Sequence, residues 1–166
     1  MKAVVPRYEN RLIQIFQILD RESFHLSAVI QRLFGQTDLV DAAWVEKRLS
    51  DPNGIDVLES FGGKFSRFQD TLSDKLLSAF LQAAGEIPGT VVENINRAER
   101  LGLVRDAQEW LGARGLRNKL VHEYVNDPAE LADSLNAARE ISQVLLTAHQ
   151  NFFEYTTNKL GIRLTE

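Results

Sequence analysis

Apolar side chains recur at steps of three and four residues along most of the chain, which is the spacing of a helix that buries one face. The first such stripe consists of Leu12, Ile15, Phe16 and Leu19. The spacing from Phe24 to Phe34 continues this stripe. The pattern therefore predicts a long helix near the start of the chain.

A second apolar stripe is longer and predicts the central helix of the fold. Its members are Val57, Phe61, Phe65, Phe68, Leu72, Leu76 and Phe80. Gly85 and Pro88 follow it and predict its end, because both residue types are common just beyond a helix C-terminus. Gly62 and Gly63 interrupt the stripe. They indicate either a kink or a close contact with another helix, and the sequence leaves both readings open.

The connection between these two helices contains a short apolar segment and a chain reversal. After Gly35, Thr37 is a candidate N-cap for a short helix that includes the apolar residues Leu39, Val40, Ala43 and Trp44. The sequence SDPNG at residues 50–54 then combines proline with glycine. Such a combination predicts a turn.

Capping residues predict where the remaining helices begin. Thr90 and Glu93 have the spacing of a capping box, so a helix should begin at Thr90 and end near Gly102. Asp106 opens the next helix. Asp127 caps the last one, with Pro128 at its first position and Glu130 at its third. This last helix should end near Gly161, and its core-facing stripe is Leu131, Leu135, Ala138, Leu145 and Phe152.

The fold class follows from this succession of helices. No strand with alternating apolar and polar residues, no internal repeat and no interdomain linker is recognisable. A chain of 166 residues with 44% hydrophobic and 25% charged residues suits one globular domain. We therefore expect residues 1–166 to form a single all-α domain, an antiparallel bundle of four to five helices.

Composition and charge exclude several classes of function. The chain has no cysteine, which excludes disulfides, thiolate metal sites and a cysteine nucleophile. No stretch reaches the ~18 apolar residues of a membrane span, and the N-terminus lacks a signal-peptide pattern. We therefore expect a cytoplasmic protein with no membrane partner. Because the net charge is −4, any nucleic-acid site has to be local.

Candidate chemistry gathers in the octet RNKLVHEY, residues 117–124. An arginine supplies a permanent fork of donors that fits phosphate oxygens, and a histidine exchanges a proton near neutral pH. Together they suffice for metal-independent RNA cleavage. In that reaction a base deprotonates the 2′-hydroxyl, the oxygen attacks phosphorus, and cations stabilise the charge that develops on the phosphoryl oxygens. Asn118 would orient either the scissile phosphate or the histidine.

Helical geometry complicates this picture. Arg117 and Tyr124 lie nearly in line on a helix, but His122 is rotated by about 140° from Arg117. Either the helix loosens near His122, or Arg117 and His122 of two chains meet across a symmetric interface. The small residues Gly112, Ala113 and Gly115 would permit such a contact between chains. They are equally compatible with close packing against a helix of the same chain.

The octet resembles the R-N-x-L-x-H-x-Y signature of the HepT-like toxins in the HEPN superfamily, and every fixed position of that signature is matched. The resemblance extends to a helical bundle over most of the chain, with the signature near the end of the penultimate long helix. The segment from about Phe24 to Asp56 is less typical and reads as an insertion or a remodelled connection.

The resemblance implies a homodimeric, metal-independent ribonuclease toxin with a composite active site in the dimer cleft. By position, Arg117 and His122 would be catalytic and Asn118 would support them. It further implies an antitoxin partner, a minimal nucleotidyltransferase of the MntA type that adenylylates the signature tyrosine, here Tyr124. The substrate would be RNA, either tRNA or mRNA, and no cofactor or metal is expected. An adenylyl phosphate on Tyr124 would lie beside Arg117 and block an RNA phosphate by charge and by volume.

Two other interpretations of the same residues stay open. Related HEPN proteins are similar to the noncatalytic, substrate-binding subunit of a two-chain nucleotidyltransferase, and a third reading is a helical scaffold with a residual octet. His25 and His149 are expected to be surface or cap residues rather than ligands. The basic residues Arg97, Arg100, Arg105, Arg114, Arg117 and Lys119 form either a local RNA-binding surface or a solvated face.

Overall fold

The computed structural model describes residues 6–122 and 127–164, and the side chains of residues 7–120 and 127–164. The elements are α1 (Pro6–Phe34), α2 (Ala42–Leu49), α3 (Pro52–Asp70), the π-helix η1 (Thr71–Leu76), α4 (Leu77–Ala83), α5 (Val91–Arg100), α6 (Ala107–His122) and α7 (Pro128–Asn158). No strand occurs in these described residues. The prediction of an all-α fold is therefore confirmed.

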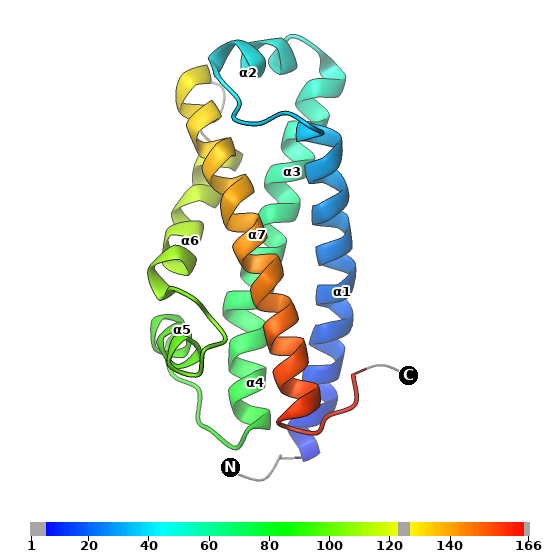
Figure 1. Ribbon diagram of the computed structural model, residues 1–166, viewed down its shortest axis with the longest axis vertical. Helices are drawn as coiled ribbons and strands as arrows, with labels where there is room; N and C mark the ends of the chain where they lie inside the picture. Colours follow the sequence, from blue (N-terminus) through cyan, green and yellow to red (C-terminus); the bar gives the residue numbers. More distant parts are fainter. Residues whose placement is uncertain (1–5, 123–126, 165–166) are drawn as a thin grey trace.

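The long helices form an antiparallel bundle (Figure 1). The chain ascends in α1, descends through α3, η1 and α4, ascends again in α6 and descends in α7. In the same view α2 lies across the upper end of the bundle, and α5 is seen almost end-on beside α4. The predicted antiparallel arrangement is thus present, with α2 and α5 as short additions to the four long segments.

The apolar stripes of the sequence form one core between these helices. The largest fully buried side chains are aromatic and come from four segments: Phe16, Phe34, Phe61, Phe65, Phe68, Phe80, Trp110 and Phe152. The stripe of the last helix is also buried, from Leu131 to Phe152. Each buried aromatic or aliphatic side chain of this size stabilises the fold by about 1.5–3 kcal/mol relative to an exposed one.

Most predicted helix ends are confirmed by their capping contacts. The amide of Glu93 donates to Thr90 Oγ1 (3.2 Å), and the amide of Thr90 donates to Glu93 Oε2 (3.4 Å), which completes the capping box. Asp127 Oδ1 accepts from the amides of Ala129 (3.0 Å) and Glu130 (3.3 Å) at the start of α7. Gly102 has a φ of 77°, which suits its place just after α5.

The predicted cap at Thr37 is wrong. The amide of Thr37 donates to the carbonyl of Phe34 (2.9 Å) and so belongs to the end of α1. The cap of α2 is Asp41, whose Oδ1 accepts from the amide of Trp44 (2.9 Å). Leu39 lies before the helix and is exposed. The Asp41 carboxylate, directly before the first helical residue, accepts from a free amide of the first turn that Thr37, four residues earlier than Asp41, does not reach.

The connection between α1 and α2 is held by two side chains of α7. The Asn136 side-chain amide donates to the carbonyl of Val40 and accepts from its amide, both at 2.9 Å. Arg139 Nη1 donates to the carbonyls of Thr37 (2.6 Å) and Asp38 (2.9 Å). These contacts bind the segment that looked atypical in the sequence to the start of α7.

The predicted turn at residues 50–54 is shorter than expected. Asp51 caps α3, and helix resumes at Pro52, so Gly54 already lies in the first turn. A Cβ built on Gly54 would lie 2.2 Å from the carbonyl oxygen of Arg48. Glycine is therefore required there because the ends of α2 and α3 approach so closely.

Gly62 lies at a close helix contact and not at a kink. α3 continues from Pro52 to Asp70 without a break, and a Cβ on Gly62 would meet the carbonyl oxygen of Leu120 in α6 at 3.6 Å. The irregularity of this long helical segment lies further on, in the π-helical residues Thr71–Leu76. The sequence did not predict it.

Candidate active site on α6

The octet begins in the third turn of α6. Asp106 opens this helix as predicted, because its Oδ1 accepts from the amide of Gln108 (2.9 Å). The backbone is helical through His122. The side chain of His122 lies outside the described residues, as does the whole of Tyr124. The structure therefore describes the surroundings of Arg117, Asn118 and Lys119, and the backbone position of His122.

Arg117 has a defined partner. Its Nη1 donates to Asp70 Oδ1, at the last residue of α3, and the two side chains are 35% and 37% exposed. This ion pair joins α3 to α6, which pack against each other along the bundle. Arg117 is thus half-buried at the edge of the helix pair, with part of its guanidinium accessible to solvent.

The neighbours of Arg117 divide between solvent and core. Asn118 is exposed, and so is Lys119, whose Nζ lies 3.9 Å from Glu130 Oε1 at the start of α7. Leu120 is buried and contacts Gly62. Leu120 thus anchors this turn of α6 in the core, while Asn118 is free to contact a molecule outside the bundle.

The basic residues around the octet are largely neutralised by acidic partners. Arg114 Nη1 lies 3.2 Å from Asp74 Oδ1, and Arg105 makes a bidentate contact with Glu109 (2.9 and 2.6 Å). With Arg117 and Lys119, four of the six basic residues singled out in the sequence face a carboxylate. The arrangement favours a solvated, ion-paired surface over a continuous RNA-binding one.

One side of α6 is open to solvent and carries two glycines. Gln108, Gly112, Gly115 and Lys119 recur at steps of four and three residues and are all exposed. A Cβ built on Gly112 or Gly115 would meet no atom of the described chain within 4 Å. Ala113, by contrast, is fully buried. Close packing within the chain therefore explains Ala113 but neither glycine.

The helical phase of the octet is unchanged by the fold. Because α6 is helical through His122, the rotation of about 140° between Arg117 and His122 is retained in one chain. Loosening of the helix before His122 does not occur. Within a single chain, the Cα atoms of Arg117 and His122 therefore lie on different sides of the helix axis.

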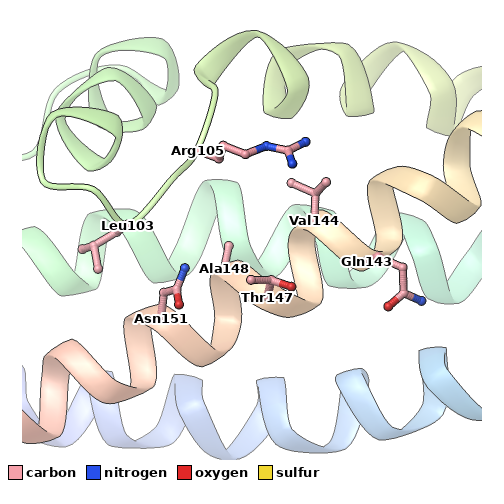
Figure 2. A pocket seen from close by; sticks show the side chains of 7 residues that line it. All are labelled: Leu103, Arg105, Gln143, Val144, Thr147, Ala148 and Asn151. Atoms are coloured by element: carbon pink, nitrogen blue, oxygen red, sulfur yellow. The ribbon is translucent and has the colours of Figure 1, made fainter.

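A separate cavity lies between the α5–α6 connection and α7 (Figure 2). Its volume is about 200 Å³, and it is lined by Leu103, Arg105, Gln143, Val144, Thr147, Ala148 and Asn151. Figure 2 shows Arg105 extended over Val144, with Asn151 and Leu103 toward the other end. None of the octet residues that the structure describes lines it. Of the basic residues singled out in the sequence, Arg105 lines it.

His149 differs from its prediction as a surface or cap residue. Its side chain is 3% exposed and lies in the core, whereas His25 is exposed as expected. Burial lowers the pKa of His149, and the nearby carboxylate of Asp20 opposes this effect. The sequence did offer a signal for this burial. His149 lies four residues after Leu145 and three before Phe152, on the buried stripe of α7.

The structure also identifies two residues that the sequence did not single out. Asp70 and Asp74 lie four residues apart on the central helix, and their partners Arg117 and Arg114 lie three residues apart on α6. The two acidic residues and the two basic residues have similar spacings, which is the one signal for these ion pairs in the sequence. The sequence does not show that the central helix and α6 lie side by side in this register. The contact spans 47 residues of chain and depends on the bundle.

Within residues 6–122 and 127–164, no three His, Asp or Glu side chains lie close enough together to hold a metal ion. None of the described helices combines the length and apolar character needed to cross a membrane. Comparisons with known protein families, with curated proteins and with solved structures found no match to this chain.

Proposed function

We propose that this protein is a HepT-like toxin of the HEPN superfamily, a metal-independent endoribonuclease whose active site is completed by a second copy of the chain. The observation that carries the proposal is the complete octet signature of the sequence, together with the edge of α6 where Arg117 is held by Asp70 and Asn118 faces solvent. An arginine, an amide and a histidine supply the donors and the base that RNA cleavage needs.

The open glycine face of α6 supports a site formed by two chains. Gly112 and Gly115 would allow another helix to approach closely, and a twofold axis beside them would bring both octets into one cleft. Arg117 is turned by about 140° from Gly112 and by about 200° from Gly115 about the axis of α6, so Arg117 of one copy and His122 of the other face the same phosphate where the partner chain extends past the glycines to the edge that carries Arg117. The rotation between them along one helix is then no obstacle.

In the proposed reaction, neutral His122 removes the proton of the RNA 2′-hydroxyl, and the resulting oxygen attacks the adjacent phosphorus. The bond to the 5′-oxygen breaks and this oxygen takes up a proton from water, while the His122 imidazolium returns its proton to water, so the products are a 2′,3′-cyclic phosphate and a 5′-hydroxyl. Arg117 stabilises the negative charge on the nonbridging oxygens. Asn118 donates a hydrogen bond from its side-chain amide to the phosphate or to the histidine.

The proposal is tested by RNA cleavage with the variants Arg117→Ala and His122→Ala. We expect the wild-type chain to cleave in excess chelator and to leave a 2′,3′-cyclic phosphate end, detected by mass spectrometry of the products. His122→Ala should abolish cleavage, and Arg117→Ala should reduce it by about 10²-fold or more. Circular dichroism should show both variants to be folded. Cleavage that stops on addition of chelator would contradict the proposed reaction class.

The alternative function is the noncatalytic substrate-binding subunit of a two-chain nucleotidyltransferase. It would use the same bundle and the same exposed edge of α6, but it needs neither a base nor a modifiable tyrosine. The presence of both His122 and Tyr124 in the octet favours the toxin. The partner proposed for the toxin is a minimal nucleotidyltransferase of the MntA type, acting as antitoxin by adenylylating Tyr124.

Intact-mass spectrometry after coexpression with a nucleotidyltransferase encoded beside this chain distinguishes the two functions. The toxin should gain the mass of one or more adenylyl groups, and Tyr124→Phe should prevent this, because the phenolic oxygen is the acceptor. The same variant should stay toxic in the presence of the partner. A chain that gains no mass, is harmless alone and instead enhances transfer to a third molecule would be the binding subunit.

A further inference from the structure

Two parallel ion pairs connect the central helix with α6, and only one of them contains an octet residue. Asp70 pairs with Arg117, and Asp74 pairs with Arg114, whose Nη1 lies 3.2 Å from Asp74 Oδ1. The helices are antiparallel, so a step of four residues forward on one matches a step of three back on the other. The two pairs therefore have similar chemistry in successive positions.

The backbone that carries Asp70 is fixed by a contact with α1. Thr71, the residue after Asp70, begins the π-helix, and its Oγ1 donates to Glu22 Oε1 at 2.6 Å. The same hydroxyl lies 2.9 Å from the carbonyl oxygen of Arg67. Thr71 is 4% exposed, so this contact is largely shielded from water. Asp70 consequently projects from a part of the fold that is held against α1.

The ion pair with Asp70 reduces the conformational entropy that the Arg117 side chain loses when a ligand binds. This side chain has several rotatable bonds, and ordering them costs conformational entropy when a ligand binds. Asp70 engages Nη1 and leaves other donors of the guanidinium available, since the group has five N–H bonds. Because Arg117 remains 35% exposed, those donors can reach a phosphate outside the bundle.

We propose that Asp70 is a positioning residue, which orients the guanidinium of Arg117 toward the scissile phosphate of RNA. This inference rests on the ribonuclease function proposed above. Asp70 touches no substrate and acts only through Arg117. The alternative effect of the same ion pair is inhibition, in which the carboxylate competes with the phosphate for the arginine. Positioning and competition predict opposite changes in rate when the carboxylate is removed.

The test compares Asp70→Asn with Asp74→Asn, the matched variant of the neighbouring ion pair. Rates are measured with a labelled single-stranded RNA and with total tRNA, at saturating and subsaturating RNA. Asp70→Asn should lower kcat by about 10- to 100-fold with a smaller change in KM. The reason is that a misplaced arginine loses its contact with the phosphoryl oxygens mainly in the transition state. Asp70→Glu should recover part of the rate. Asp74→Asn should stay within about twofold of wild type, since Arg114 is outside the octet.

Chemical rescue separates positioning from a general structural effect. Guanidinium ion added at millimolar concentration should partly restore cleavage by Arg117→Ala, because Asp70 can hold the free ion where the side chain was. The double variant Arg117→Ala with Asp70→Asn should not respond. A merely structural carboxylate would lower the melting temperature and leave the rescue unchanged.

Each other outcome overturns a specific statement. A rate for Asp70→Asn at or above that of wild type would show competition or no role. Equal losses in Asp70→Asn and Asp74→Asn would show that the ion pairs serve the fold. If Arg117→Ala and His122→Ala are inactive while Asp70→Asn is unaffected, the positioning proposal fails and the ribonuclease proposal stands. A wild-type chain that cleaves no RNA overturns both.

Discussion

The imidazole of His149 is enclosed by aromatic rings in the core. It stacks on Phe16, with 6.1 Å between ring centroids, and meets the edge of Phe68 at 5.9 Å. Its Nε2 lies 3.4 Å from Asp20 Oδ1 but is not aligned for a hydrogen bond, and Nδ1 has no partner among the described residues. A charged imidazolium would be costly there, because burial removes its hydration and only one exposed carboxylate compensates.

This environment makes the stability of the fold depend on pH. The pKa of His149 is lowered from its ordinary value of 6.5 in the folded chain, with burial as the main cause. Below that value the unfolded chain binds a proton that the folded chain does not bind. The free energy of unfolding should therefore decrease as the pH falls below about 6.5, by at most about 1.4 kcal/mol per pH unit.

Melting temperatures of wild type and His149→Phe between pH 7.5 and pH 5.0 measure this contribution. We expect wild type to lose more stability than His149→Phe as the pH falls, because phenylalanine does not titrate.

Glu22 has the opposite effect on the pH dependence of stability. Burial raises its pKa above 4.5, so its contribution to stability decreases as the pH rises above about 4.5. Adding Glu22→Gln to both chains removes this effect, and equal slopes in the two resulting chains would contradict the role of His149.

At the level of whole elements, the contacts that the sequence predicted are local ones. The capping box of Thr90 and Glu93 and the cap at Asp127 join groups at most three residues apart, so the residue types and their spacing suffice. The apolar stripes likewise predicted the buried faces of α1, of the central helix and of α7, except at Phe24, which is 72% exposed. The described part of the signature octet, residues 117–122, also lies on a helix that opens at Asp106, as predicted.

The features that the sequence did not predict depend on contacts between distant segments. The π-helix at Thr71–Leu76 is accompanied by the hydrogen bond from Thr71 to Glu22, 49 residues away. Asp70 reaches Arg117 only because α3 and α6 pack in one particular register. The burial of His149 requires the rings of Phe16 and Phe68 from two other helices. No spacing along the chain contains this information.

At the scale of the whole molecule, the exposed glycines of α6 are unfavourable for an isolated chain. Each glycine inside a helix costs about 1 kcal/mol relative to alanine, and no atom of the described chain packs against Gly112 or Gly115. An isolated chain would gain from alanine at both positions. A close contact with a second copy gives these glycines a physical role, because a side chain would hold the two helices apart.

Replacing Gly115 with glutamine tests this contact without disturbing the fold of one chain. The new side chain would extend into solvent in a single chain, so Gly115→Gln should fold normally and show unchanged helicity by circular dichroism. At about 10 µM, light scattering should give wild type twice the 18.8 kDa mass of one chain and Gly115→Gln the single mass.

Ala28→Gln is the matched control, since Ala28 is an exposed small residue on α1, away from the glycine face, and this variant should remain dimeric. A monomeric wild type would contradict the composite site, whereas a dimeric Gly115→Gln would place the interface on another face of the bundle. RNA cleavage by Gly115→Gln should fall together with the dimer, because His122 of one chain would no longer meet Arg117 of the other.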